Sequence, residues 1–445
     1  MIDSEAILQE IMPNMVDVGT VWVAFSGGLD SSVLLHLASR WQQSSEFADK
    51  TLAALHVNHQ LSSQATRWRE HCHTIAANYK IPFVCETVTV AKSQRGVEHE
   101  AREQRYRAFA KHMGDRDVML FAHHAEDQAE TMLFRLLRGS GLTGLCGMAA
   151  SRPLARGKLL RPLLHHSKQQ LCAYAAQYGL EWVEDESNFN TDFDRNFLRQ
   201  QIFPLLRDRW ASAVQKMTQS AQWLSEAEHL LMEHAEQDLC RCQHRKERLG
   251  ESIALETFFD FSVARQKNII RFWVKRHNYT LPSADQLAQL SSLLSAKIDG
   301  LPTLAWGQCE LRRYANRVYL IPRLGPVNSG EEVEWSGATV AALADGSRLE
   351  CLSAGTGPFQ ISFRCGGERC KPLTRGHSQR LKKLLQEYAV EPWLRDRAPL
   401  IRVAGAIVAV ADIFACDARF AGGGVSDGNG QCAQSKPNFR WYYPS

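Results

Sequence analysis

A short loop near the N-terminus has the composition of a phosphate-binding site. It reads, in order, Ser26, Gly27, Gly28, Leu29, Asp30 and Ser31. The two glycines allow a tight turn and a close approach of the backbone to an anion, while serine hydroxyls and the free N–H groups of a helix start can bind phosphate oxygens. Bare phosphate would repel Asp30, so we expect a Mg²⁺ ion between this carboxylate and the phosphates. The alternative is an ordinary strand-to-helix turn in which Ser and Asp are caps.

Two carboxylates form a second group that could do chemistry. Asp127 and Glu130 are three residues apart directly after a short apolar run, and Thr131 follows. On a helix these side chains share one face, and paired carboxylates at the end of a central strand could hold an ammonium group or a metal ion. The alternative is an acidic first turn, which the helix dipole stabilises by about 0.3–1 kcal/mol. We interpret His123 and His124, just before the pair, as hydrogen-bonding loop residues.

Four arginines could contact phosphate. Arg102 and Arg105 are three apart on an expected helix, so both could face one polyanion, and arginine is the preferred partner of phosphate. Arg195 and Arg199 follow a later apolar run, in a segment rich in turn-forming residues. The second pair could bind phosphate or cap the next helix, and the first pair could belong to a solvated helix face.

The elements that must position these residues follow from the hydrophobic pattern. Short apolar or β-branched runs predict strands at residues 21–25, 52–57, 83–88, 118–122 and 180–183. Helix-length stretches lie between these five runs, at residues 31–41, 63–79, 98–113 and 125–138. Strands that alternate with helices predict an α/β fold with a doubly wound parallel sheet. Ligands should then gather at the carboxyl ends of the strands.

The chain has 445 residues, enough for about three domains. We expect a catalytic domain over residues 1–211, a mostly helical middle domain over 212–320 and a linker over 321–344. A small, basic, mixed α+β domain over 345–421 and a flexible tail over 422–445 follow.

The last of these domains is locally basic, although the whole chain carries a net charge of only +4. Between Arg364 and Arg402, ten lysines and arginines stand against four acidic residues. Such an excess can follow the phosphates of an RNA, and a tryptophan in the same stretch could stack on a base. The candidate RNA-binding residues are Arg364, Arg369, Lys382, Lys383, Trp393, Arg395 and Arg397. The alternative is a solvated charged face.

Composition excludes several classes of protein. No apolar run approaches the roughly 18 residues of a membrane span, and the acidic N-terminus lacks the basic region of a secretory signal. The 12 cysteines include no Cys-x-x-Cys pair, so we expect reduced thiols and a cytoplasmic location. An apolar share of 44% excludes a disordered or fibrous chain.

The motifs together resemble one family of enzymes. Ser-Gly-Gly-x-Asp-Ser after a first strand resembles the pyrophosphatase loop of enzymes that split ATP into AMP and pyrophosphate. Within that superfamily, nearly the whole chain resembles the tRNA(Ile)-lysidine synthetases. The matching stretches of the first domain, besides the loop, are His56–His59, Glu100–Tyr106, His123–Thr131 and Glu184–Arg199.

The resemblance implies a ligase that joins L-lysine to the wobble cytidine of the isoleucine tRNA with a CAU anticodon. The cytidine would first be adenylated, pyrophosphate and then AMP would leave, and the lysidine formed would change decoding from AUG to AUA. ATP is thereby implied as co-substrate and Mg²⁺, on Asp30, as cofactor. Asp127 and Glu130 would hold the lysine.

The same resemblance assigns roles to the remaining candidates. ATP would contact the Ser26–Ser31 loop, His56 and Arg105, and Arg102 would act at phosphate during catalysis. Arg195 and Arg199 would join the RNA-binding residues of the last domain.

Three alternatives remain open at this point. A tRNA thiolase would share the ATP loop but need sulfur chemistry, and the missing Cys-x-x-Cys argues against its iron–sulfur form. An ammonia-using amide synthetase such as NAD synthetase would not need a basic C-terminal domain. A non-catalytic tRNA-binding module would tolerate the loss of Asp30, Asp127 or Glu130, yet all three are present.

Overall fold

The structure is a computed structural model. It describes residues 2–444 apart from 48, 61–63, 90–96, 185–190, 192–193, 296–301, 328–329, 331, 353–356 and 422–436. The chain divides into two compact units, Met1–Leu230 and Leu231–Ser445. The domain boundaries expected at residues 211, 320, 344 and 421 stay predictions.

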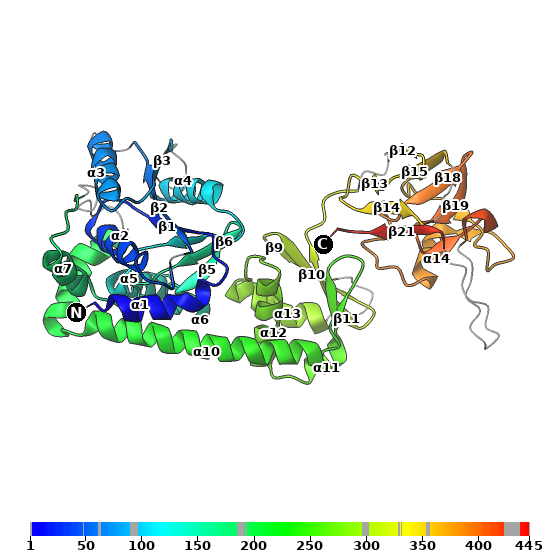
Figure 1. The fold of residues 1–445 in the computed structure, drawn as a ribbon. Coiled ribbons are helices and arrows are strands. Elements are labelled where there is room, and N and C mark those ends of the chain that lie inside the picture. The colour runs from blue at the N-terminus through cyan, green and yellow to red at the C-terminus, as the bar shows by residue number, and fades with distance from the viewer. Residues whose placement is uncertain are drawn as a thin grey trace. The chain divides into compact units, whose positions relative to one another are not determined.

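A six-stranded sheet in the order β3-β2-β1-β4-β6-β5 organises the first unit (Figure 1). Its strands are β1 (Thr20–Ala24), β2 (Thr51–Asn58), β3 (Phe83–Thr87), β4 (Val118–Leu120), β5 (Ser151–Leu154) and β6 (Gly157–Leu160). β1 pairs in parallel with β2 and β4, β2 with β3 and β4 with β6. Only the edge strand β5 is antiparallel. The predicted doubly wound parallel sheet is confirmed.

Helices cover both faces of this sheet. The helices of the first unit before residue 210 are α1 (Ser4–Ile11), α2 (Leu29–Trp41), α3 (Ala65–Asn78), α4 (Val97–His112), α5 (Ala125–Leu137), α6 (Leu142–Leu145), α7 (Lys168–Gln177), α8 (Asp194–Phe197) and α9 (Phe203–Arg209). Alternation along β1 explains the two layers. Val21 and Val23 join the core with α1, α2 and α7, while Trp22 and Ala24 pack with Phe109 of α4 in the second core.

The fifth predicted strand, residues 180–183, is not a strand. Val183 donates one backbone hydrogen bond to the Gly27 carbonyl (2.9 Å), so this segment lies beside the phosphate-binding loop instead of in a ladder. β6 takes the expected place next to β4. With four residues, β6 is too short for its periodicity to identify it in advance.

The second unit begins with helices that pack on an antiparallel sheet of order β7-β8-β11-β10-β9. The helices after α10 (Ala213–Arg241) are α11 (Leu255–Phe259), α12 (Val263–Arg276) and α13 (Ala284–Ser295). The strands are β7 (Arg245–Lys246), β8 (Glu251–Ala254), β9 (Thr303–Trp306), β10 (Cys309–Tyr314) and β11 (Arg317–Pro322). The helices agree with the sequence pattern, whereas the sheet was not expected, because charged residues such as Arg312 and Arg313 interrupt the apolar alternation of β10.

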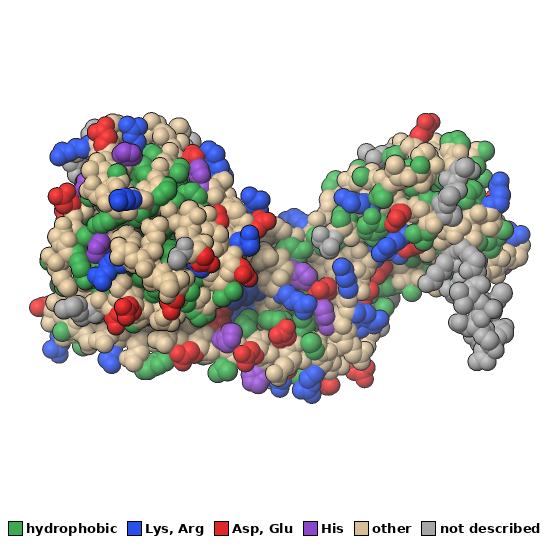
Figure 2. All heavy atoms as spheres, viewed as in Figure 1, with side chains coloured by type: hydrophobic (Ala, Val, Ile, Leu, Met, Phe, Trp, Pro, Cys, Tyr) green, Lys and Arg blue, Asp and Glu red, His purple; other side chains and the backbone are tan. Residues whose placement is uncertain are grey.

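The long helix α10 begins the segment that the sequence predicts to be mostly helical. Only part of its apolar face is buried. Ala221 and Ala235 are buried, but Trp223 is 59% exposed, and Leu230 and Leu231 are also exposed. Hydrophobic side chains therefore reach the surface along α10, as Figure 2 shows.

The C-terminal part is built from small antiparallel sheets and one short helix. A five-stranded sheet contains β12 (Glu332–Trp335), β15 (Phe359–Ser362), β18 (Leu400–Val403), β19 (Ala406–Val410) and β20 (Phe414–Ala415). β13 (Ala341–Ala342), β14 (Arg348–Cys351) and β21 (Phe439–Tyr442) form a second sheet, β16 (Arg369–Cys370) and β17 (Gln379–Arg380) a third, and α14 spans Leu381–Glu387. The mixed α+β composition is as predicted.

The chain end, for which the sequence predicts a flexible tail over 422–445, contains the strand β21. It pairs antiparallel with β14, with Trp441 opposite Leu349. Phe439 and Trp441 are buried in the core of this part, so burial of two aromatic side chains holds the end in place. Residues 422–436 of the predicted tail lie outside the described residues.

Candidate active site

The phosphate-binding loop connects β1 to α2 at the carboxyl end of the sheet. Gly27 has φ +83°, and a Cβ atom there would lie 2.7 Å from Cys72 Sγ, so only glycine fits without moving its neighbour. Gly28 is the N-cap of α2, which begins at Leu29. The free N–H groups of the first helical turn therefore follow directly after the loop, where an anion can accept from them.

Serine hydroxyls lie on both sides of this loop. Ser26 Oγ is 3.0 Å from Ser31 Oγ, and Ser31 Oγ donates to the Gly28 carbonyl (3.0 Å). Ser32 Oγ is buried and has no hydrogen-bond partner among the described residues. The loop thus combines hydroxyl groups with backbone donors, a combination suited to phosphate oxygens.

His56 supports the loop from β2. Its Nδ1 lies 2.9 Å from the Phe25 carbonyl and 3.6 Å from Cys72 Sγ. The ring is buried, and that burial lowers the pKa of His56, so the imidazole is neutral at pH 7. His56, a predicted ATP contact, holds the strand end that carries the loop.

His124 links the loop to the predicted acid pair. Its Nε2 lies 3.5 Å from both Asp30 Oδ2 and Asp127 Oδ2, and its Nδ1 donates to Glu126 Oε2 (3.0 Å). Burial opposes a charged imidazole, but the hydrogen bonds and charges of these carboxylates outweigh it and raise the pKa of His124 to about 10. The imidazolium joins the ends of β1 and β4, which are neighbouring strands.

The acid pair contacts one guanidinium. Arg199 donates from Nε and Nη2 to the two oxygens of Glu130 (2.7 and 2.8 Å) and from Nη2 to Asp127 (3.0 Å). Glu130 is 2% exposed; burial raises its pKa, and Arg199 offsets only part of that rise. Burial also acts on Asp127, but the surrounding cations, His124 first, lower its pKa overall. Arg195 lies beside the pair and donates to Thr131 Oγ1 (3.1 Å).

Arg102 and Arg105 do not face the same group. Arg105 Nε donates to His59 Nε2 (3.3 Å), just after β2. The Arg102 guanidinium instead lies over the Tyr106 ring, 5.2 Å from its centroid. The two arginines therefore diverge from α4, with Arg105 on the side of the phosphate-binding loop.

Five of the candidate RNA-binding residues of the C-terminal part keep charge at or near the surface. Arg369, Lys382 and Lys383 are exposed, and Lys383 also lies 3.8 Å from Glu387. The other two are half-buried: Arg364 pairs with Asp396, and Arg395 donates from Nε to the Val390 carbonyl (2.9 Å).

Trp393 and Arg397 lie in the interior. Trp393 is 8% exposed, and its ring packs at 4.9 Å from Tyr319. Arg397 is also buried, pairs with Asp345 (3.7 Å) and donates to the Gly325 carbonyl. Their side chains have structural partners, so a base-stacking role for Trp393 and an RNA contact by Arg397 do not fit this geometry.

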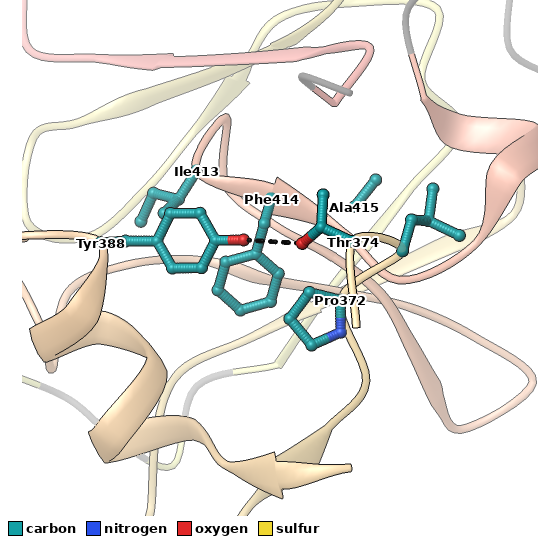
Figure 3. Close-up of a pocket in the computed structure, with 7 residues that line it drawn as sticks. Pro372, Thr374, Tyr388, Ile413, Phe414 and Ala415 are labelled. Carbon is teal, nitrogen blue, oxygen red and sulfur yellow. Dashed lines mark hydrogen bonds between the residues drawn. The ribbon is translucent and has the colours of Figure 1, made fainter. Parts of the chain in front are cut away.

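Two hollows of the surface lie away from the strand ends. One, of about 10 Å³, is lined by Tyr388, Phe414 and Pro372 in the C-terminal part (Figure 3); Tyr388 Oη lies 3.4 Å from Thr374 Oγ1 there. A volume of this size holds at most about one water. The other, about 470 Å³, lies between α3 and the edge strand β3. Neither contains a loop or acid-pair residue.

No group of three or more His, Cys, Asp or Glu side chains suited to a metal ion occurs in the part of the chain that the structure describes. A cation at Asp30 would therefore take most of its ligands from phosphate and water. Within the same residues no helix is long and apolar enough to cross a membrane.

Comparisons with known proteins identify the group to which the chain is related. A PP-loop domain model matches residues 3–206, a TilS substrate binding domain model matches residues 254–319, and a TilS substrate C-terminal domain model matches residues 359–431. The PP-loop match covers the parallel sheet with its loop and acid pair.

Curated relatives cover almost the whole chain. The tRNA(Ile)-lysidine synthase of Pseudomonas aeruginosa PAO1 is 42% identical over 94% of this chain and 95% of its own length. That of Serratia proteamaculans is 39% identical over 89% of this chain and 91% of its own length. The chain belongs to the tRNA(Ile)-lysidine synthase family. The resemblance inferred from the motifs is confirmed, and with it an ATP-dependent ligase.

A solved U34-tRNA thiolase, NcsA from Methanococcus maripaludis, is similar at a TM-score of 0.38 and 15% identity, over 50% of this chain and 80% of that one. We draw nothing from a likeness this low. The thiolase alternative gives way to the family relationship, which covers all parts of the chain.

Several residues around the site were not predicted. Arg135, Arg152 and Arg161 lie near His123 and Tyr106, and none of them belongs to a motif. They come from α5, β5 and the residue after β6, so sequence spacing gives no signal that they meet. Residues 185–190 and 192–193 of the Glu184–Arg199 stretch lie outside the described residues.

Proposed function

We propose that the chain joins L-lysine to the wobble cytidine of the isoleucine tRNA with a CAU anticodon, using ATP. The observation that carries this proposal is the pair of half-buried Asp127 and buried Glu130, one strand away from a phosphate-binding loop, in a chain of the tRNA(Ile)-lysidine synthase family. A phosphate-binding loop and a buried anionic site for a cationic amine are the two sites that such a ligation needs.

The reaction has two steps. The ring carbonyl oxygen of the cytidine attacks the α-phosphate of ATP, and the bond to pyrophosphate breaks. The side-chain amine of lysine then attacks the activated ring carbon, loses a proton, and AMP leaves with the former carbonyl oxygen. The protein contributes by positioning the reactants and neutralising phosphate charge.

The nucleotide is proposed to bind with its phosphates on Ser26–Ser31 and with Arg105 beside them. Mg²⁺ fits at Asp30, because Asp30 Oδ1 is buried and has no hydrogen-bond partner among the described residues. When bound, the ion would neutralise phosphate oxygens as pyrophosphate leaves. His124 holds the other Asp30 oxygen, which fixes the direction of the carboxylate.

Lysine is proposed to bind at Asp127 and Glu130. Arg199 now balances both carboxylates, and its side chain is 39% exposed, so it can move aside for the ammonium group of the substrate. Glu130 is the better proton acceptor of the two, because burial raises its pKa while that of Asp127 is lowered. The amine would then be neutral when it attacks.

The RNA is proposed to contact the basic residues at or near the surface of the C-terminal part: the exposed Arg369, Lys382 and Lys383 and the half-buried Arg364 and Arg395. Arg195 would contribute from the first unit, near the acid pair. Because the proposed substrates are ATP, lysine and a tRNA, we also propose that the reaction takes place in the cytoplasm.

The deciding experiment supplies the protein with ATP, labelled lysine and a transcript of the CAU-anticodon isoleucine tRNA. We expect label in the RNA and one AMP released per lysine incorporated. A transcript with uridine at the wobble position is the control and should take up no label. AMP release with the correct transcript but without label in the RNA would overturn the proposal.

A further inference from the structure

Arg161 is a buried cation without a carboxylate partner among the described residues. It follows β6, is 5% exposed, and donates from Nε to His123 Nδ1 (3.0 Å) and from Nη1 to the Ala149 carbonyl. Both acceptors are neutral, because burial and the nearby arginines lower the pKa of His123 to about 3 against the opposing charge of Asp127. A buried charge that lacks a counter-charge is unfavourable.

Four more arginines surround Arg161, from four different elements. The five form the arginine cluster: Arg102 of α4, Arg135 of α5, Arg152 of β5, Arg161 after β6 and Arg195 of α8. Over the described residues, no carboxylate oxygen lies within 4.0 Å of a guanidinium nitrogen of the cluster. Arg135 is held by neutral groups too, donating to the Gly144 and Gly147 carbonyls (2.9 and 2.7 Å).

Tyr106 lies at the accessible side of the cluster. The guanidinium carbons of Arg102 and Arg152 lie 5.2 and 5.0 Å from its ring centroid. Tyr106 Oη is buried and lacks a hydrogen-bond partner among the described residues. Arg102 is exposed and Arg152 half-buried, so a ligand from solvent can reach both.

The like charges destabilise one another. Burial and the charges of Arg152, Arg102 and Arg135 together lower the pKa of Arg161 to about 10, against an opposing influence of Tyr106. Burial and the charges of Arg195 and Arg102 lower the pKa of Arg135 as well. An anion bound among these side chains would relieve the repulsion, and guanidinium groups match the geometry of phosphate oxygens.

The position of the cluster identifies the phosphate. The sheet order is β1-β4-β6-β5 on this side, with the ATP loop after β1, the acid pair after β4, and Arg161 after β6. Two strand spacings of about 4.8 Å separate β1 from β6, so the ATP phosphates on the loop and a phosphate at the cluster occupy different places. The acid pair begins the helix that lies between them.

We propose that the arginine cluster binds a backbone phosphate of the substrate RNA close to the cytidine that is modified. This inference rests on the proposed function, because that function requires an RNA at the same strand ends. The order along the sheet is then nucleotide, lysine and RNA phosphate. The sequence motifs do not include this site, since only Arg102 and Arg195 lie in them.

Arg152→Gln tests the site, with Arg156→Gln as its matched control. Both residues belong to the β5–β6 hairpin, and both changes remove one positive charge. Arg156 lies on the surface and pairs with Asp115 (3.3 Å). Binding of the CAU-anticodon tRNA is measured between 50 and 200 mM salt, roughly the range over which salt weakens binding to phosphates, and binding of ATP with Mg²⁺ is measured without RNA.

We expect Arg152→Gln to weaken tRNA binding about fivefold or more and to reduce the salt slope by about 0.7, the value for one phosphate contact on a single strand. Arg156→Gln should match the wild type, and neither change should alter ATP binding. Equal tRNA affinity and salt slope in the two variants would overturn the proposal. A loss of ATP affinity with unchanged tRNA binding would also overturn it and assign the cluster to the triphosphate.

Two further measurements keep the result interpretable. If Arg152→Gln does not fold, as judged by circular dichroism, Arg102→Gln replaces it, because Arg102 is exposed and contacts the same ring. Lysine incorporation by the wild type is measured in parallel. If the wild type binds RNA through Arg152 but incorporates no lysine, the phosphate site stands and the proposed function is overturned.

Discussion

At the scale of single residues, the loop and the acid pair each contain one position at which a substitution should disturb the geometry. Gly27 combines a positive φ with a neighbouring sulfur at contact distance. Glu130 is buried and accepts two hydrogen bonds from one guanidinium. Both positions allow direct tests.

Gly27→Ala should impair the nucleotide step. A Cβ atom would meet Cys72 Sγ, and the strain of about 1–3 kcal/mol would shift the loop. This strain corresponds to a loss of about 5- to 150-fold in rate. The measurement is AMP formation with the CAU-anticodon tRNA. Gly139→Ala is the control, because Gly139 also has a positive φ but nothing lies within 4 Å of its Cβ position. Equal loss in both variants would contradict a specific role of the loop.

Glu130→Gln should separate the two steps of the reaction. Hydrogen bonds to a charged group contribute about 1.5–3 kcal/mol, so lysine incorporation should fall about 10- to 100-fold. Pyrophosphate release on mixing ATP and tRNA should continue, because the adenylation step does not use this carboxylate. Asp194→Asn removes a surface carboxylate paired with Arg138 (3.2 Å) and should change neither step. Loss of both steps in Glu130→Gln would contradict a lysine-specific role.

At the scale of elements, Glu251 connects three parts of the middle sheet and its helices. Its Oε2 accepts hydrogen bonds from His244 Nε2 (2.7 Å), His277 Nε2 (2.8 Å) and Trp273 Nε1 (2.8 Å). Burial alone would raise the pKa of Glu251, but these bonds outweigh it and lower the pKa to about 2. Glu251, the first residue of β8, thus connects His244, which precedes the strand, to Trp273 and His277 at the C-terminal end of α12.

Glu251→Gln should destabilise the protein at neutral pH, by about 1–3 kcal/mol. A carboxyl group whose pKa is lowered on folding adds stability above its usual value near 4.5, and this stability is lost as the pH falls toward about 2. Urea unfolding of variant and wild type from pH 7 down to pH 3 measures the difference, which should shrink with falling pH. Glu256→Gln, at an exposed position of α11, is the control and should leave stability unchanged. A difference independent of pH would rule out the titration of Glu251 as its source.

At the scale of the whole molecule, the C-terminal part, which contains the basic residues, is joined to the middle sheet by side-chain contacts within the second unit. Arg248, in the turn between β7 and β8, pairs with Asp412 (2.9 Å) and lies over the Trp441 ring at 4.6 Å. Leu249 and Tyr319 of the middle sheet belong to the same core as Trp393. These two side chains therefore pack with the C-terminal sheets, while most apolar residues of the middle sheet and its helices form a core of their own.

Lys382→Gln combined with Lys383→Gln should weaken tRNA binding without abolishing catalysis. Removing two phosphate contacts would reduce the salt slope by about 1.4–1.8. The measurement is tRNA affinity as a function of salt, together with lysine incorporation at saturating tRNA. Lys216→Gln with Lys246→Gln removes the same charge from exposed positions of α10 and β7 and should have no effect. An equal effect of both double variants would mean that net charge, and not the position on α14, governs binding.

The sequence determined the features that depend on local spacing. Ser26–Ser31 after an apolar run predicted a phosphate-binding loop, and the spacing of Asp127 and Glu130 predicted their shared face, because a turn and a helical repeat are set by neighbours in the chain. The parallel sheet followed from the alternation of strands and helices.

Only the tertiary structure decided which distant side chains meet. Arg199 contacts Glu130 across 69 positions of the chain, and the arginine cluster draws on four elements and the residue after β6. Trp393 looked available for a base, yet the fold buries it against Tyr319. Periodicity records which face of an element is apolar, but the partner of that face, and the counter-charge of each ion, depend on how the elements pack.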